Sequence, residues 1–214
     1  MESMYVDIAC NSRTVTDNDV REILFSSVQR HLNGMVLLPQ FIPSTKDFCP
    51  EGMDLSCFVD YPYGSSDTSV RSHAAITSIR KGATVLDVVA NSGLLTNAKK
   101  AKFYDDIETI KALTDDHKVL LRILLEYRLF EAKDIIAIGN VLREMGIEFV
   151  VPSSGAQMDT WEDNLAIAVE LTEKAGINVI TNGGVRTRRQ YEAVKETKVF
   201  GIRFTSHKIV EEVL

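Results

Sequence analysis

The stretch Phe149-Val150-Val151-Pro152-Ser153-Ser154-Gly155 is an apolar run that ends at a proline and continues into two hydroxyl side chains and a glycine. An apolar run without alternation is typical of a parallel strand that is covered on both faces. Pro152 cannot donate a backbone hydrogen bond, so it belongs at the end of the strand. The hydroxyls then lie where a ligand could meet them, although a polar turn without any function would show the same pattern.

The sequence on both sides of this stretch alternates between helix and strand patterns. A glycine that ends a helix is followed within about two residues by an apolar run at Gly34, Gly82, Gly146 and Gly176. Strands are expected at residues 5–9, 35–38, 55–61, 85–90, 119–125, 149–152, 178–180 and 199–204. This alternation predicts the α/β class, with a single (β/α)8 TIM-type barrel of parallel strands as one domain over residues 1–214. An open doubly wound sheet would alternate in much the same way.

Composition narrows the classes of function. The chain has 214 residues, is 45% hydrophobic and 25% charged, and carries a formal net charge of -6. An acidic protein without a surplus of Lys and Arg is poorly suited to nucleic acid. The three cysteines lack the spacing of a zinc site, so we expect reduced thiols, no metal and no cofactor. We also expect no membrane segment and a cytoplasmic location.

Polar residues after the last two predicted strands indicate a phosphate site. Gly183 and Gly184 follow the seventh strand, and Thr205 and Ser206 follow the eighth. In barrels of this kind these two loops commonly bind phosphate, because glycine lets backbone N–H groups approach an anion. A tight turn is the alternative explanation of Gly183 and Gly184, and the matching loop after the eighth strand favours phosphate over it.

Single charges also occur inside three apolar strands, at Asp7, Asp87 and Arg122. An unpaired buried charge is costly, so these three side chains are expected to meet inside the barrel. They would form either the polar floor of a ligand site or a buried ion cluster that sets the register of the barrel. At the strand ends, Glu126 and the group Ser153, Ser154 and Gly155 would line the substrate pocket.

These residues together resemble the deoxyribose-phosphate aldolase family, class I aldolases that join acetaldehyde to glyceraldehyde 3-phosphate. The similar segments are residues 82–89, 121–126 and 183–187 and the pair Thr205 and Ser206, so that the resemblance runs over nearly the whole chain. It implies that Asp87 matches the acid that helps proton transfer and that Asp7 matches the acid of the first strand. Arg122 stands where the family has a lysine.

The resemblance fails at the catalytic lysines. Val151 aligns with the lysine that forms the Schiff base, and Ile180 aligns with the second lysine, which lowers the pKa of the first. Neither side chain can form an imine. Lys46 and Lys208 are the lysines that we expect near the carboxyl-terminal rim, and exposed lysines there would stay protonated. Arg122 cannot substitute, because a guanidinium does not lose its proton.

Three functions remain open. The first is an aldolase-like barrel that has lost Schiff-base chemistry and binds a small phosphorylated sugar in a binding, regulatory or structural role. The second is an active carbon-carbon lyase on a sugar phosphate, with Asp87, Asp7 and Arg122 as catalytic residues. The third is a subunit whose barrel surface binds a partner, either another protein or a second copy of this chain.

Overall fold

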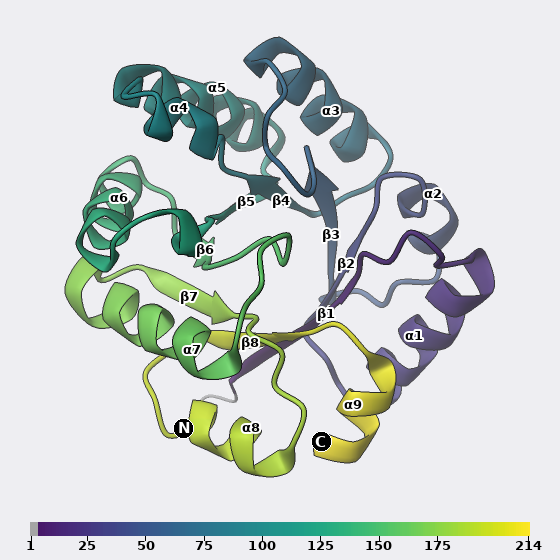
Figure 1. The fold of residues 1–214 in the computed structure, drawn as a ribbon. Helices are drawn as coiled ribbons and strands as arrows, with labels where there is room; N and C mark the ends of the chain where they lie inside the picture. The colour runs from purple at the N-terminus through teal and green to yellow at the C-terminus, as the bar shows by residue number, and fades with distance from the viewer. Residues whose placement is uncertain (1–3) are drawn as a thin grey trace.

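The computed structural model describes residues 4–214, and within that range eight parallel strands close into a barrel surrounded by helices (Figure 1). Neighbouring strands in the barrel are also neighbours in the sequence, from β1 round to β8, and β8 pairs with β1. The strands are β1 (Tyr5–Cys10), β2 (Gly34–Leu37), β3 (Asp54–Val59), β4 (Val85–Val89), β5 (Leu120–Leu124), β6 (Phe149–Val151), β7 (Asn178–Thr181) and β8 (Gly201–Phe204). The predicted TIM barrel is confirmed, because an open doubly wound sheet would leave two strand edges unpaired.

The helices form the outer layer and connect consecutive strands. They are α1 (Asp17–Gln29), α2 (Ile42–Thr45), α3 (Thr68–Arg80), α4 (Ser92–Thr96), α5 (Lys100–His117), the 3-10 turn η1 (Tyr127–Leu129), α6 (Ala132–Glu144), α7 (Trp161–Glu170), the π-helical turn η2 (Leu171–Ala175), α8 (Arg188–Lys195) and α9 (His207–Val213). The short elements α2, α4 and η1 were not predicted, since segments of three to five residues are too short to show helical periodicity. No helix in residues 4–214 is long and apolar enough to cross a membrane.

Local sequence signals explain where several helices begin. Thr16 and Asp19 form a capping box at α1, in which the Thr16 hydroxyl accepts from the Asp19 N–H and the Asp19 carboxylate accepts from the Thr16 N–H. Thr187 and Gln190 form a second capping box at α8. Thr160 caps α7 by accepting from the Asp163 N–H.

Glycines have two different structural roles at the turns from helix to strand. Gly176 ends the helical segment η2 in a left-handed conformation, with φ of 65°, as the turn signal predicts. Gly34 is instead the first residue of β2, and a Cβ there would lie 2.5 Å from the Tyr5 hydroxyl oxygen. Glycine at position 34 therefore makes room for a side chain inside the barrel.

The apolar side chains form two cores. The larger core lies between the strands and the surrounding helices. The smaller core lies inside the barrel, receives one residue from each of β1 to β7, and consists of Ala9, Val36, Phe58, Val89, Leu124, Val151 and Ile180. Each of these side chains is buried. We call this second group the inner apolar layer.

Candidate functional site

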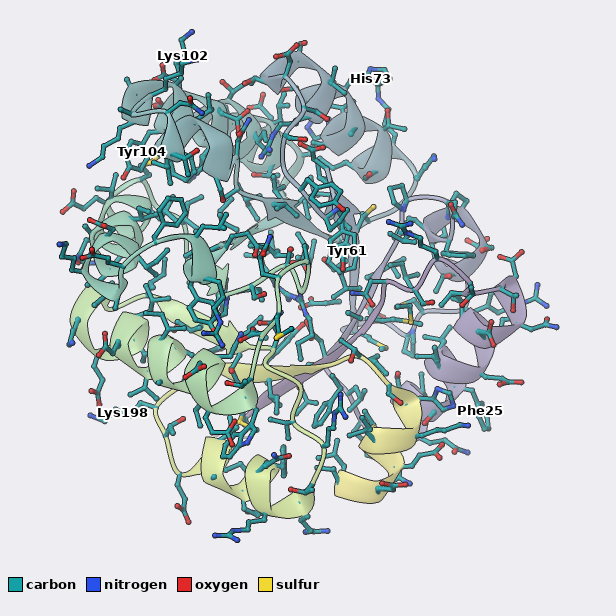
Figure 2. The ribbon with its side chains drawn as sticks, viewed as in Figure 1. Phe25, Tyr61, His73, Lys102, Tyr104 and Lys198 are labelled. Carbon is teal, nitrogen blue, oxygen red and sulfur yellow. The ribbon has the colours of Figure 1, made fainter. Side chains whose placement is uncertain are left out.

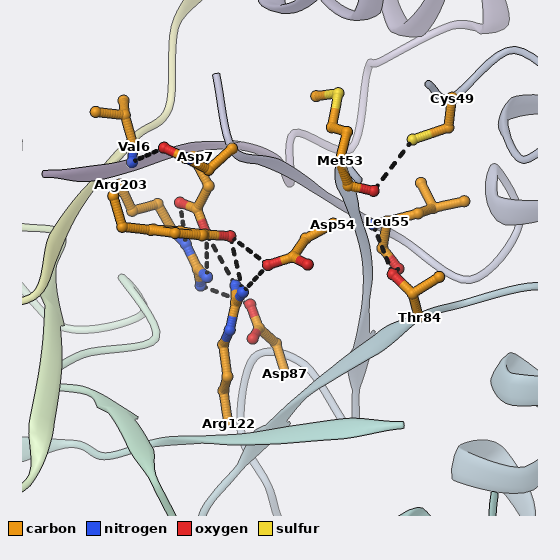
Figure 3. Close-up of polar contacts among 12 residues, drawn as sticks. Val6, Asp7, Cys49, Met53, Asp54, Leu55, Thr84, Asp87, Arg122 and Arg203 are labelled. Carbon is orange, nitrogen blue, oxygen red and sulfur yellow. Dashed lines mark hydrogen bonds and ion pairs between the residues drawn. The ribbon is translucent and has the colours of Figure 1, made fainter. Parts of the chain in front are cut away.

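A network of buried charges occupies the inside of the barrel (Figure 3). Arg122 on β5 contacts Asp7 on β1 across the barrel, with Nη1 3.1 Å from Oδ2. Arg203 on β8 lies between two carboxylates, with Nη2 2.8 Å from Asp7 Oδ2 and Nη1 2.7 Å from Asp87 Oδ2. The predicted convergence of Asp7, Asp87 and Arg122 is confirmed, and Arg203 is the residue that joins Asp87 to Asp7.

The network continues towards the amino-terminal end of the barrel. Arg122 Nη2 donates to Asp54 Oδ2 at 2.5 Å and to the Tyr5 hydroxyl at 2.7 Å, and Tyr5 donates in turn to Asp54 at 2.8 Å. The Arg122 guanidinium also lies over the Tyr5 ring, 5.0 Å from its centroid. Both guanidinium groups thus have carboxylate partners that fix their positions.

Strand register explains why these residues meet. Asp7 lies beside Arg203 in the pairing of β1 with β8, and Asp87 lies beside Arg122 in the pairing of β4 with β5. The sequence analysis missed Arg203, although a lone charge in the apolar segment Gly201–Phe204 is the same signal that marked Arg122. It also missed Asp54, because the third strand was expected to begin one residue later.

Burial and neighbouring charges shift the ionisation of this network in opposite directions. Burial raises the pKa of Asp87, although Arg203 and Arg122 oppose the shift. Burial alone would lower the pKa of Arg203, but Asp7 and Asp87 outweigh it and raise that pKa. Asp7, Asp54 and Asp87 face only Arg122 and Arg203 in these contacts, which leaves one negative charge in excess. Protonation of Asp87 would neutralise that excess.

The inner apolar layer separates the charge network from the carboxyl-terminal end of the barrel. Ala9, Val89 and Leu124 follow Asp7, Asp87 and Arg122 by two residues on the same strands, so they point inward one level higher. Val151 and Ile180 belong to this layer, and each is 0% exposed. The buried charges are therefore not open to the rim, which favours the ion cluster that sets register over the polar floor of a ligand site.

The predicted substrate-pocket residues come together at the rim around Glu126, which follows β5. Glu126 Oε1 accepts the backbone N–H of Ser154 at 2.6 Å, and the Ser153 hydroxyl accepts the N–H of Gly155 at 2.9 Å. Asn182 Nδ2 donates to the Ser153 carbonyl oxygen at 2.7 Å. Burial raises the pKa of Glu126, and the hydrogen bonds from Ser154 oppose that shift.

Contacts to Asp159 hold the loop between β6 and α7, residues 152–160, across the barrel mouth (Figure 1). The Tyr127 hydroxyl donates to Asp159, and Asn164 on α7 donates from Nδ2 to Asp159 at 2.7 Å and to Asn182 at 3.0 Å. Asn164 thereby connects this loop to the end of β7. Tyr127 and Asn164 carry no signal in the sequence alone, because an isolated polar or aromatic residue is ordinary in a helix or a turn.

Another rim contact lies on the opposite side of the mouth. Asn11, directly after β1, donates from Nδ2 to the Tyr61 hydroxyl oxygen at 2.7 Å. The Tyr61 ring packs against Phe58 of the inner apolar layer, with 4.4 Å between the ring centroids. Burial raises the pKa of Tyr61, and the charge of Glu126 adds to the rise. Figure 2 shows Tyr61 near the middle of the barrel mouth.

The predicted phosphate residues lie at the ends of β7 and β8. Gly184 has φ of 77° and nothing within 4 Å of an added Cβ, and Thr205 is exposed. Gly183 differs, because its added Cβ would clash with the Asn164 side chain and would lie 2.9 Å from the Trp161 backbone. Close packing against α7 therefore requires glycine at 183, whatever the loop binds. Ser206 precedes α9 without making a capping hydrogen bond.

No lysine with a buried side chain occurs in the described part of the chain. The expected position of Lys46 at the carboxyl-terminal rim is wrong. Its aliphatic carbons lie beside Gly82, in the turn that precedes β4 at the amino-terminal end of the barrel. Lys208 is exposed on α9. Within residues 4–214, no group of three His, Cys, Asp or Glu side chains is arranged to hold a metal ion.

The chain matches no family model. It is 24% identical over 185 residues to a deoxyribose-phosphate aldolase of Mannheimia succiniciproducens, covering 85% of this chain and 81% of that protein. It is 24% identical over 196 residues to the same enzyme of Histophilus somni, covering 90% and 86%. The solved deoxyribose phosphate aldolase of Aeropyrum pernix superimposes with a TM-score of 0.85 at 22% identity, over 96% of this chain and 87% of that one. A second solved aldolase superimposes with a TM-score of 0.88 at 19% identity, over 97% and 93%.

Proposed function

We propose that this chain, a distant relative of the deoxyribose-phosphate aldolases with their (β/α)8 barrel, has no Schiff-base chemistry and binds a phosphorylated sugar at its carboxyl-terminal rim. The observation that carries the proposal is the inner apolar layer. Val151 and Ile180, which the resemblance places at the two lysine positions of the enzymes, are both fully buried among apolar side chains. The barrel interior therefore offers a packed core at both positions.

The chemistry of imine formation supports the same conclusion. A lysine attacks a carbonyl as the neutral amine, and burial or a neighbouring cation is what lowers its pKa towards neutrality. Each lysine in residues 4–214 is exposed or only half-buried. An exposed lysine keeps a pKa near ~10.4 and is almost entirely protonated at neutral pH.

The charge network is better suited to a structural role than to catalysis. Asp7 and Asp87 are each 0% exposed, and the inner apolar layer lies between them and the rim. Arg203 binds both carboxylates, so a proton transfer by Asp87 would have to break an ion pair inside the core. We assign Asp7, Asp87, Arg122 and Arg203 to holding the strands in register.

The phosphate-binding part of the proposal depends on the loops after β7 and β8. Gly184 is open to its surroundings, Thr205 is exposed, and Ser206 makes no capping hydrogen bond. Their hydroxyl and N–H groups can donate to phosphate oxygens. The protein would then bind a small phosphorylated sugar without cleaving it.

Borohydride trapping tests the loss of Schiff-base chemistry. The protein is incubated with deoxyribose 5-phosphate and borohydride, and its intact mass is measured, with the Mannheimia succiniciproducens aldolase as a positive control. We expect no adduct on this chain under conditions that label the control. A lysine adduct on this chain would overturn the proposal. A thermal-shift screen with pentose and triose phosphates tests binding, because a ligand that binds only the folded state raises the melting temperature.

The partner-binding function keeps one observation in its favour. Leu24, Phe25 and Val28 on α1, with Phe48 and Pro50, line an apolar groove of about 520 Å³, and Phe25 and Phe48 are 65% and 67% exposed. Exposed apolar patches of this kind often mark protein contacts. A homodimer or another complex that is lost in Phe25→Ser, together with no response to any phosphorylated sugar, would favour this function over sugar binding.

A further inference from the structure

Two side chains at the barrel mouth have hydrogen-bonding capacity that the described residues do not use. The first is Glu126, which is only 6% exposed. Its Oε1 accepts from the Ser154 N–H, whereas its Oε2 is buried and has no hydrogen-bond partner within residues 4–214. A buried carboxylate oxygen without a donor is costly, so such an atom points to a missing group.

The second is Tyr61, whose hydroxyl lacks an acceptor, whereas Glu126 Oε2 lacks a donor. Its oxygen accepts from Asn11 Nδ2 at 2.7 Å, and no acceptor in the described chain receives its proton. Asn11 fixes the position of the oxygen, and packing of the ring against Phe58 fixes the ring. The hydroxyl proton is thus available at a defined place over the barrel.

Glu126 and Tyr61 follow β5 and β3, which lie on either side of β4. Tyr61 packs on Phe58 of the inner apolar layer, and Glu126 reaches the Ser154 N–H in the loop after β6, so both side chains lie over the mouth of the barrel. One group therefore offers a donor and the other an acceptor at the same end of the barrel. An alcohol hydroxyl both accepts and donates a hydrogen bond, so it satisfies the two at once.

We propose that Tyr61 and Glu126 form a hydroxyl-binding pair at the barrel mouth, in which a sugar or polyol hydroxyl accepts from Tyr61 and donates to Glu126 Oε2. The pair lies at the carboxyl-terminal ends of the strands, where ligands of barrel proteins bind. Asp87 is not an equivalent site, because its Oδ2 lies 2.7 Å from Arg203 Nη1 and the inner apolar layer covers it.

The loop at residues 152–160 controls access to this pair. Its Ser154 N–H is bonded to Glu126, and the loop crosses the mouth (Figure 1). A ligand hydroxyl would reach Oε2 after a shift of this loop, whereas Tyr61 is already partly exposed. For phosphorylated sugars the inference rests on the proposed function and extends it, because the pair would bind the sugar part across the barrel mouth from the phosphate loops. For free sugars it stands independently.

Isothermal titration of four single variants tests the proposal. Tyr61→Phe removes only the hydroxyl, and Glu126→Gln keeps an acceptor for Ser154 while replacing the carboxylate. The matched controls are Tyr63→Phe, on the same loop and 67% exposed, and Glu131→Gln, on an exposed side chain. Each protein is titrated with deoxyribose, deoxyribose 5-phosphate and inorganic phosphate, and its melting temperature confirms folding.

We expect Tyr61→Phe and Glu126→Gln each to lower the affinity for both sugars about tenfold. Loss of one hydrogen bond to a neutral or charged group has an effect of this size. Inorganic phosphate should bind all variants equally, and the two controls should match the original protein. Equal affinity of the original protein and Tyr61→Phe for the sugars would overturn the hydroxyl pair and leave phosphate binding intact. If deoxyribose binds as tightly as deoxyribose 5-phosphate and inorganic phosphate does not bind, the result would support the pair and overturn the phosphate-loop part of the proposed function. Failure of both sugars to bind would mean that an ordered water fills the gap, and the pair would be rejected.

Discussion

Arg203 holds Asp7 through two parallel hydrogen bonds, from Nε to Oδ1 at 2.9 Å and from Nη2 to Oδ2 at 2.8 Å. This fork geometry is specific to arginine and joins the first strand of the barrel to the last. The same guanidinium reaches Asp87 on β4 at 2.7 Å. Closure of the barrel and neutralisation of its interior charges therefore depend on the same side chain.

Removing the Arg203 side chain should strongly lower the stability of the fold. We expect Arg203→Met to lower the free energy of unfolding by about 3–5 kcal/mol, because it leaves Asp7 and Asp87 without their shared cation in the core. Urea unfolding followed by circular dichroism measures the change. Lys133→Met serves as the control, since Lys133 pairs with Glu131 on the surface and should cost less than ~1 kcal/mol. Similar losses in the two variants would contradict the structural role of Arg203.

Asp87 should make the protein less stable as pH rises. Burial raises its pKa, so the folded state keeps this proton at pH values where the unfolded chain, with an aspartate pKa near ~3.9, has lost it. The folded state then binds more protons, and stability declines from about pH 4 up to the folded-state pKa. Asp87→Asn removes this titration and should unfold with a flatter pH profile and equal or higher stability at neutral pH. Parallel profiles for the two proteins would show that Asp87 is ionised in the folded state.

A lysine placed at Val151 should gain reactivity and lose stability. A lysine buried in the inner apolar layer has its pKa lowered by several units, so Val151→Lys should destabilise the fold by about 3–5 kcal/mol and hold a neutral amine at neutral pH. Borohydride with a small aldehyde should then label residue 151, as peptide mapping would show. The control is Val70→Lys, at a 57% exposed site, which should stay protonated and unlabelled. An unlabelled, folded Val151→Lys protein would place this side chain out of reach of the mouth.

Arg71 should support the loop that carries Tyr61. It is fully buried, pairs with Asp60 at 3.2 Å and Asp106 at 3.1 Å, and donates to the Gly64 and Val89 carbonyl oxygens. Arg71→Met should cost about 3–5 kcal/mol, because two carboxylates lose their cation. It should also weaken sugar binding through Tyr61. Arg80→Met, an exposed change on the same helix, is the control for both measurements. Unchanged sugar affinity in a folded Arg71→Met protein would show that the contacts of Arg71 do not influence ligand binding at the barrel mouth.

Local signals in the sequence predicted most of the fold. The apolar strands and the glycine that ends η2 are short-range features, and each lies where it was expected. The short helices α2 and α4 were missed because so few residues show no period. The convergence of Asp7, Asp87 and Arg122 was predictable from the cost of burying a lone charge.

The sequence by itself determined the alternation of strands and helices and the absence of lysine at positions 151 and 180, because periodicity and residue identity are properties of single segments. Closure of the strands into a barrel was decided by the tertiary structure. Only the tertiary structure decided which groups meet. Register placed Arg203 between Asp7 and Asp87, and strand alternation placed the inner apolar layer over them. It also brought Tyr61 and Glu126, which are far apart in the chain, to one end of the barrel. Such pairings depend on how distant strands align, and no local pattern encodes that alignment.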